Sequence, residues 1–324
     1  MTPDALRELA AFSAELGRDP EQVQAAGGNT SLKADGLLWV KASGLWLADA
    51  LQRELFVPVA LAPVLDGIAA QAADPVTQAV VAERNPASLR PSIETTLHAL
   101  LPHRIVVHTH SVRTIALAIR ADGKSRIAER LAGLARAWVP YCKPGLPLTA
   151  AVAERLAGRP ADILILGNHG LVVGADTVPA ADALLREVER RLDGPAERLT
   201  PPSAPAAVPG WRAPVHPMVH TLALDPHRAA RACTGSLYPD HVIFLGPAAT
   251  AAPEPGPSIL LLEAGRGACL ADGSGPSADE LALCLALVLE RVPAAAVLHY
   301  LTAAEEAELL NWDAEQYRQA LAKR

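Results

Sequence analysis

The segment His108-Thr109-His110 is the strongest candidate for chemistry in this sequence, because it closes the apolar run 105–107. Side chains of a β-strand alternate between its two faces, so residues two positions apart share a face. Two imidazoles on one face can bind a borderline metal such as Zn²⁺. The same pattern also fits one core and one rim histidine, so the pair alone leaves both interpretations open.

A third candidate ligand, His169, follows a second apolar run, residues 163–166, and precedes Gly170. It therefore also lies where a predicted strand ends, and functional residues often gather at such ends. Three histidines on two strand ends would leave one coordination position open. That pattern is typical of a catalytic rather than a structural zinc site.

Composition limits the classes of protein that fit this chain. Its 324 residues, half of them hydrophobic, can form one large domain or two ordinary ones. A net charge of −6 argues against a nucleic-acid or membrane-surface role, which would need a basic face. The cysteines lie far apart without C-x-x-C spacing, so we expect reduced, buried thiols in a cytoplasmic protein. They are Cys142, Cys233, Cys269 and Cys284.

The amino-terminal segment 1–17 has apolar residues at helical spacing, interrupted by Asp4, Glu8 and Glu15. This pattern predicts an amphipathic helix and not a signal peptide, which would need an uninterrupted apolar core. No uncharged apolar stretch approaches the roughly 18–20 residues that cross a bilayer. We therefore expect no membrane partner.

Helices and strands are expected to alternate up to about residue 192. The pattern predicts a strand over residues 37–41, a partly helical irregular stretch over 48–89, and a helix over 92–100 that Ser92 can cap. The helix leads into the strand that carries His108. This alternation indicates a layered α/β or α+β domain.

The chain changes character after residue 194. Residues 195–214 are rich in Pro and Ala and have little periodicity, which is typical of a linker. We therefore expect a metal-dependent domain over residues 1–194 and a smaller α/β region over 215–324. That second region is expected to contain helices over 216–231, 278–291 and 303–323 and a short strand over 258–262.

Glu94 is the candidate acid or base, because a carboxylate near a divalent metal can move a proton to or from the substrate. A glutamate in the first turn of a helix is also a routine partner of the helix dipole. The turns at residues 27–31 and 43–44 offer N–H groups and hydroxyls suited to an anion. Neither turn has the spacing of a P-loop, and each can be only a turn.

The remaining histidines and the tryptophans carry weaker signals. His216 and His220 are four residues apart but lack the H-E-x-x-H pattern, so we expect them to be solvated. No companion ligand accompanies His98, His103, His227, His241 and His299. The tryptophans are scattered, which favours core or interface positions.

Five motifs in sequence order resemble the class II aldolase/adducin family over roughly residues 6–192. They are GNTS at 28–31, ASG at 42–44, PSIE at 91–94, HTHS at 108–111 and NHG at 168–170. More narrowly, residues 27–33, 39–44 and 91–95 look like the aldolase half of bifunctional rhamnulose-1-phosphate aldolase/alcohol dehydrogenase proteins. Residues 238–243 and the segment around Trp312 resemble their connecting region. Because no G-x-G-x-x-G turn is present, we expect a stand-alone aldolase-like unit.

The resemblance implies a fold and a set of site residues. The fold would be α/β, an α/β/α sandwich around a largely antiparallel sheet, with a smaller carboxy-terminal α/β region. Zn²⁺, or another divalent metal, would be held by three histidines, and Glu94 would be the catalytic acid/base. The assembly would be a homo-oligomer, a dimer or a tetramer. The implied metal ligands are His108, His110 and His169, and the implied phosphate pocket is Asn29, Ser43, Gly44 and Ser92.

The implied reaction is retro-aldol cleavage of a sugar phosphate of the ketose type, through a metal-stabilised enediolate. One position departs from the family pattern, since sugar-phosphate aldolases commonly have a second Ser where this chain has Ile93. A phosphate requires partners for each oxygen, so a related unphosphorylated hydroxy-ketone is also allowed. Epimerases and dehydratases of the family use the same metal site, and the spacing of the motifs does not distinguish them from aldolases.

A different class of function is an adducin-like, non-catalytic scaffold. Adducin-like members lack the complete metal set, so the intact histidine triad with Glu94 favours the enzyme. A basic tail would have supported the scaffold, and the sequence shows none. The partner we expect is a small sugar or sugar phosphate, with no nucleic acid.

Overall fold

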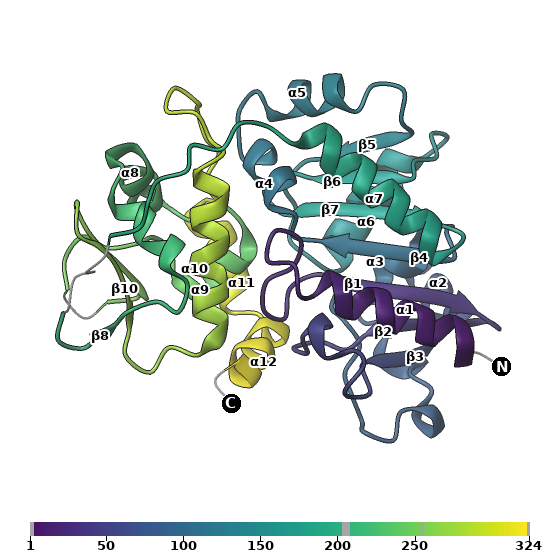
Figure 1. Ribbon diagram of the computed structural model, residues 1–324. Coiled ribbons are helices and arrows are strands. Elements are labelled where there is room, and N and C mark those ends of the chain that lie inside the picture. The colour runs from purple at the N-terminus through teal and green to yellow at the C-terminus, as the bar shows by residue number, and fades with distance from the viewer. Residues whose placement is uncertain (1–2, 203–207, 254–255, 323–324) are drawn as a thin grey trace. The chain divides into compact units, whose positions relative to one another are not determined.

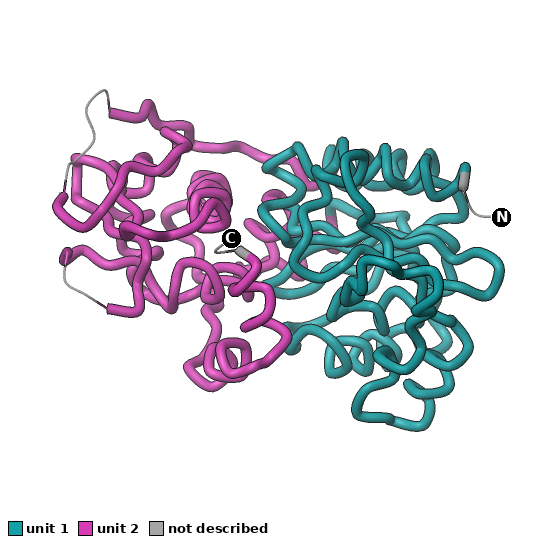
Figure 2. Tube along the Cα trace, turned by 90° about the horizontal axis from the view of Figure 1, so that it is seen from below, with its two compact units in different colours: residues 1–111, 130–191 teal, residues 112–129, 192–324 magenta. Residues whose placement is uncertain are grey.

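The computed structural model describes residues 3–202, 208–253 and 256–322, in two compact units (Figure 2). Unit 1 consists of residues 1–111 and 130–191, and unit 2 of residues 112–129 and 192–324. The domain boundaries proposed from sequence, at residues 194 and 214, stay a prediction.

Unit 1 is built on a seven-stranded sheet with the order β3-β2-β1-β4-β7-β6-β5 (Figure 1). Every neighbouring pair is antiparallel except β5 and β6, which run parallel. The strand predicted over residues 37–41 is confirmed. The strands are β1 (Asn29–Ala34), β2 (Leu37–Lys41), β3 (Phe56–Ala60), β4 (Ile105–Thr109), β5 (Arg136–Val139), β6 (Ile163–Leu166) and β7 (Gly170–Ala175).

Helices cover both faces of this sheet. Ser13 of α1 (Pro3–Leu16) hydrogen-bonds Thr30, and His98 of α3 (Thr95–Leu100) hydrogen-bonds Ser31 on the opposite face. On the α1 face lies α7 (Val178–Leu192), where Arg186 pairs with Glu15 of α1 (Figure 1). The other face carries α2 (Leu61–Ala69) and α6 (Leu146–Leu156). The predicted α/β/α sandwich around a largely antiparallel sheet is confirmed.

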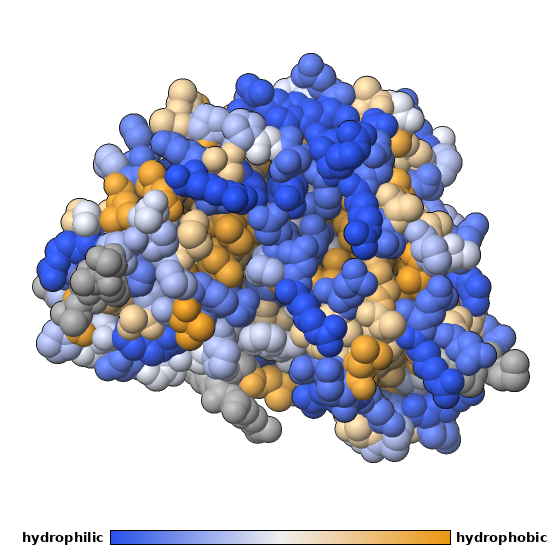
Figure 3. Space-filling model, in the orientation of Figure 1, coloured by the Kyte–Doolittle hydropathy of each residue, from blue (hydrophilic) through white to orange (hydrophobic). Residues whose placement is uncertain are grey.

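The hydrophobic core lies under α3 and α6. Leu97 and Val152 of these helices pack with strand residues of β4, β6 and β7, all buried. The outer face of α7 instead carries exposed ion pairs of Arg186 with Asp182 and of Arg190 with Glu187, and it is hydrophilic in Figure 3. Burial on one side and charge on the other is the expected division for a helix that covers a sheet.

Two local features of unit 1 differ from the sequence expectations. Strand β3 was not predicted, because Pro58 interrupts its pattern, but β3 is an edge strand of the sheet, where proline is tolerated. The helix expected from residue 92 begins at Thr95. Ser92 instead begins a turn. Its Oγ accepts a hydrogen bond from the N–H of Glu94, and its carbonyl oxygen accepts a hydrogen bond from the hydroxyl of Thr95.

Unit 2 is a smaller α/β unit around a nearly all-buried helix, α10 (Pro276–Leu289), as the predicted carboxy-terminal α/β region implies. Helix α10 packs against α4 (Val112–Ala118), α9 (Pro239–Leu245) and the 3₁₀ segment η4 (Pro217–Ala223). Its sheet has the antiparallel order β8-β10-β9. The other elements are α5 (Gly123–Arg130), β8 (Trp211–Arg212), α8 (Pro226–Thr234), β9 (Leu260–Glu263), β10 (Gly267–Ala271), α11 (Ala303–Leu310) and α12 (Asp313–Ala322).

Two helices predicted in this region are each divided in the structure. The expected helix 216–231 is η4 followed by α8, because Pro226 has no N–H to continue a helix and Asp225 caps α8 by accepting from the N–H of Arg228. The expected helix 303–323 ends first at Leu310, and α12 begins after Asn311 and Trp312. Residue 323 lies outside the described residues.

The cysteine expectation is wrong for part of the set. None of the four forms a disulfide within the described ranges, and Cys269 and Cys284 are buried as expected, but Cys233 is exposed and Cys142 is half-buried. In the three described ranges, no helix combines the length and the apolar character that a membrane crossing requires.

The buried His241 makes the stability of unit 2 dependent on pH. Its Nδ1 accepts a hydrogen bond from the N–H of Leu237, and burial lowers the pKa of His241 from 6.5 to about 3. Below pH 6.5 the unfolded chain binds a proton that the folded chain does not bind. We therefore expect His241 to lower the free energy of unfolding by up to about 1.4 kcal/mol per pH unit between pH 6.5 and 3.

Urea unfolding of the wild type and of His241→Gln at pH 7.5, 6 and 5 measures this contribution. The wild type should lose more stability than the variant as the pH falls. Equal losses in both proteins would show that His241 does not contribute.

Candidate metal centre

The three predicted histidine ligands come together in unit 1. One ring nitrogen from each of His108, His110 and His169 lies within 4.8 Å of the others, and all three side chains are buried. Their ring centroids are 4.9 to 5.3 Å apart and their planes are steeply inclined to one another. Among the described residues this is the group whose donor atoms could hold a metal ion.

Strand pairing explains why residues far apart in sequence meet here. His108 on β4 pairs with Val172 on β7 and, on the other side, with Asn29 on β1. His169 lies in the tight turn between β6 and β7, where Asn168 adopts a φ of 50°. Asparagine tolerates this left-handed conformation better than most residues, so it suits the turn that presents His169.

Two glycines allow the backbones around the centre to approach closely. A Cβ on Gly170 would lie 2.3 Å from the carbonyl oxygen of Thr109, so no side chain fits there. A Cβ on Gly28 would lie 2.9 Å from the carbonyl oxygen of His108, and Gly28 also has a φ of +59°. The glycines of the two predicted motifs are therefore needed for close packing beside the histidines.

Glu94 faces the histidines from the start of α3. Its Oε2 lies 3.4 Å from Nε2 of His108 and its Oε1 lies 3.6 Å from Nε2 of His169. Burial raises the pKa of this carboxyl, but the facing imidazoles and a hydrogen bond from Asn29 outweigh burial and lower the pKa to about 2. Glu94 is thus a buried carboxylate that is ionised at neutral pH.

Asn29 holds this carboxylate in place, and Ser92 accepts hydrogen bonds from Asn29 and from the N–H of Glu94. Nδ2 of Asn29 donates to Oε2 of Glu94 at 2.8 Å and to Oγ of Ser92 at 3.2 Å. Both residues are buried, as is Glu94. Two of the four residues assigned to a phosphate pocket therefore contact the candidate acid/base directly.

The other two residues of the predicted pocket, Ser43 and Gly44, lie on the adjacent segment. The N–H of Ser43 donates to the carbonyl of Arg90, and the N–H of Ser92 donates to the carbonyl of Lys41. The segment that follows β2 is therefore paired with the segment that carries Ser92. No hydrogen bond from the Ser43 hydroxyl to Asn29 or Glu94 is present among the described residues.

Sequence reasoning missed two supporting residues. Lys41 is buried, and its Nζ donates to the carbonyls of Ala26 and Gly28 at 2.7 and 2.9 Å, which fixes the turn before Asn29. Gln24 donates to the carbonyl of His110. A lysine at the end of an otherwise apolar strand was the available signal for Lys41, whereas nothing in the sequence distinguishes Gln24.

The remaining histidines take no part in this cluster. His216 contacts Glu280, and Nδ1 of the buried His220 accepts from the N–H of Ala268, so the expectation that both are solvated is wrong for His220. His98 and His103 contact Ser31 and Asp162. These contacts are structural.

The donor set fits a divalent metal. Nδ1 of His108 lies 3.0 Å from the carbonyl oxygen of Leu171, and a carbonyl only accepts, so Nδ1 carries the proton and Nε2 is left as the metal-binding atom. Three neutral imidazoles suit zinc, copper, iron or nickel. The buried carboxylate of Glu94 would contribute negative charge beside the ion.

Comparisons with known proteins match the amino-terminal part of this chain. A family model described as the class II aldolase and adducin N-terminal domain matches residues 7–193. The uncharacterized oxidoreductase YuxG of Bacillus subtilis (strain 168) is 33% identical over 191 residues, which are 54% of this chain and 27% of that protein. This chain thus spans only about a quarter of the length of that relative.

A solved structure shares the fold. The N-terminal class II aldolase domain of a conserved protein from Thermoplasma acidophilum is 26% identical, with a TM-score of 0.50. The similarity covers 59% of this chain and 92% of that domain. It therefore covers almost all of the Thermoplasma domain.

Replacing two of the histidines should abolish metal binding. We expect the wild type to bind a divalent metal and His108→Ala/His110→Ala to bind none, because one imidazole remains of three. Elemental analysis of protein purified without a His tag, after zinc is offered, measures this directly. His216→Ala is the matched control and should bind as the wild type does. Equal metal content in the double variant and the wild type would contradict the ligand set.

Proposed function

Because this chain belongs to the family of class II aldolase and adducin N-terminal domains, we propose that it is a metal-dependent, aldolase-type lyase. The observation that carries the proposal is the buried cluster of three histidines with Glu94 directly beside it. A non-catalytic scaffold would have no need for a buried carboxylate that faces three imidazoles. Burying such a charge destabilises the fold unless an opposite charge or hydrogen bonds compensate it.

In this proposal His108, His110 and His169 hold Zn²⁺ or another divalent metal. When bound, the metal supplies Lewis acidity that polarises the ketose carbonyl and hydroxyl oxygens. The three histidines would hold the ion in position, and the Leu171 carbonyl fixes the tautomer of His108. No Schiff-base lysine is then required.

Glu94 is proposed to move the proton. In the direction of cleavage, the carboxylate of Glu94 accepts the proton of the hydroxyl on the fourth carbon of the ketose as the bond between the third and fourth carbons breaks and the fourth carbon becomes the aldehyde. Glu94 then gives that proton to the third carbon. In the direction of synthesis, the ionised carboxylate removes that proton. Asn29 would keep the carboxylate oriented through its 2.8 Å hydrogen bond.

The proposed substrate is a ketose phosphate or a related hydroxy-ketone, bound by Asn29, Ser43, Gly44 and Ser92. Both hydrogens of Asn29 Nδ2 are directed to Glu94 and Ser92, and Ile93 brings no hydroxyl. The donors left for an anion are the hydroxyls of Ser43 and Ser92, whose Oγ only accepts from Asn29 and Glu94, and backbone N–H groups. Because this is a small set for a phosphate dianion, unphosphorylated ketoses belong in the same test.

The direct test incubates the zinc-loaded protein with ketose 1-phosphates and the corresponding free ketoses, and follows the products by NMR. Release of dihydroxyacetone phosphate, or of dihydroxyacetone, with an aldehyde is the expected result. A full metal content with epimerised or dehydrated product instead would replace the lyase by an epimerase or a dehydratase on the same site. Absence of metal would favour the adducin-like scaffold.

Glu94→Gln should separate metal binding from turnover. The amide keeps the shape of the side chain but cannot exchange a proton, so we expect the rate of cleavage to fall by at least about 100-fold. Metal content should remain that of the wild type. Glu154→Gln, at an exposed position of α6, is the matched control and should leave the rate unchanged. Wild-type turnover in Glu94→Gln would exclude the proposed role.

A further inference from the structure

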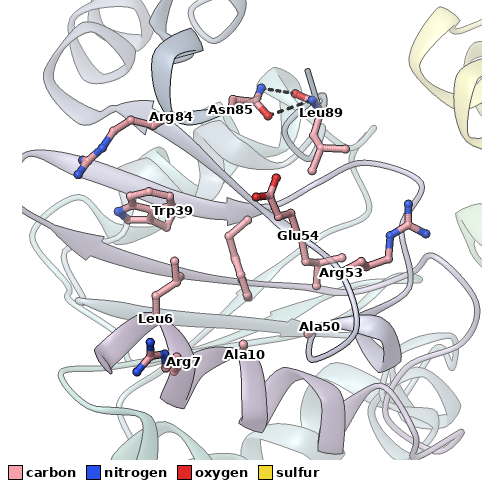
Figure 4. Close-up of a pocket in the computed structure, with 12 residues that line it drawn as sticks. Leu6, Arg7, Ala10, Trp39, Ala50, Arg53, Glu54, Arg84, Asn85 and Leu89 are labelled. Atoms are coloured by element: carbon pink, nitrogen blue, oxygen red, sulfur yellow. Dashed lines mark hydrogen bonds between the residues drawn. The ribbon is translucent and has the colours of Figure 1, made fainter. Parts of the chain in front are cut away.

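A pocket of about 280 Å³ lies in unit 1, and none of the three clustered histidines lines it (Figure 4). Residues of α1, of β2 and of the segments around residues 50–56 and 84–89 line it. Its apolar wall is formed by Leu6, Trp39, Phe56 and Leu89. In Figure 4, Arg84, Trp39 and Leu6 lie at one side of the pocket and Arg53 at the other.

Strand register places this pocket on the face of the sheet opposite Asn29 and His108. Trp39 pairs with Leu32 of β1, whereas His108 pairs with Asn29 of the same strand. Cross-strand partners share a face, and positions three apart in a strand face opposite sides. The pocket is therefore a separate site and not an extension of the metal centre.

The charges around the pocket are mostly positive. Three arginines, Arg7, Arg53 and Arg84, contribute to its lining against one carboxylate, Glu54. Arg7 is paired with Asp4 at 3.5 Å, but neither Arg53 nor Arg84 has an ion-pair partner among the described residues. All of these charged side chains are exposed, so their charges are available to a ligand.

Arg84 and Trp39 form a flat, cationic surface in this pocket. The guanidinium carbon of Arg84 lies 5.5 Å from the centroid of the Trp39 ring. The guanidinium over the indole is itself planar and exposed, so it can stack on a planar group, and its edge presents paired N–H donors to a carboxylate or a phosphate. A ligand that combines a planar apolar body with an anionic group uses both features at once.

We propose that this pocket binds a small organic anion with an aromatic body, such as an aromatic phosphate or carboxylate. The apolar wall accepts the ring, and Arg84, with Arg53, supplies the positive charge that balances the anion. Apolar lining with a few placed polar groups is the usual composition of a small-molecule site. The site does not depend on the proposed lyase activity.

Isothermal titration calorimetry of the full chain, without added metal, tests this with three probes. Phenyl phosphate should bind more tightly than inorganic phosphate, which lacks the ring, and more tightly than benzyl alcohol, which lacks the charge. Binding should weaken with added salt, because the arginines are exposed. Absence of binding, or phenyl phosphate binding no tighter than inorganic phosphate, would overturn the proposal.

Substitution of charged residues tests whether phenyl phosphate binds in this pocket. Arg53→Gln/Arg84→Gln should weaken phenyl phosphate binding by about 10-fold, and Glu54→Gln should tighten it by about twofold. Arg159→Gln removes an exposed arginine outside the pocket lining and should bind as the wild type does. Because all four side chains are exposed, these substitutions leave the core intact. Unchanged affinity in the double arginine variant would place the ligand elsewhere and overturn the proposal.

Discussion

The candidate site depends on one physical constraint, the burial of an ionised carboxylate among three imidazoles. Removing a carboxylate from water costs several kcal/mol unless charges or hydrogen bonds compensate it. Around Glu94, with no metal bound, the compensation comes from the positive charge of the facing His108 and His169 rings when they are protonated and from the Asn29 hydrogen bond, which together lower the pKa of its carboxyl despite burial. A bound divalent cation would compensate the same charge, so the arrangement is suited to a metal.

The other elements of unit 1 position Glu94 and the three histidines. Strand β4 is central, and its pairing with β1 and β7 places Asn29 on one side of His108 and the His169 turn on the other. Helix α3 then presents Glu94 from one face of the sheet, while α1 closes the opposite face. Gly28 and Gly170 are needed because the adjoining backbones leave no room for a Cβ.

The sequence predicted the layered fold and the meeting of three histidines because these follow from local patterns. A period of two fixes which residues share a strand face, and the ordered motifs resemble a family. The sequence did not predict β3, whose proline obscures the strand pattern, nor the breaks at Pro226 and at Asn311, where local capping overrides a continuous helical pattern. Nor did it predict that Asn29 donates to Glu94, because that contact depends on the register of β1 against β4.

The most direct test of the central claim is an anomalous-difference map at the zinc absorption edge, recorded from crystals of the zinc-loaded protein. The account predicts one strong peak per chain, with His108, His110 and His169 as its three nitrogen ligands and Glu94 adjacent. A peak elsewhere, or none among these histidines at full zinc loading, would contradict it.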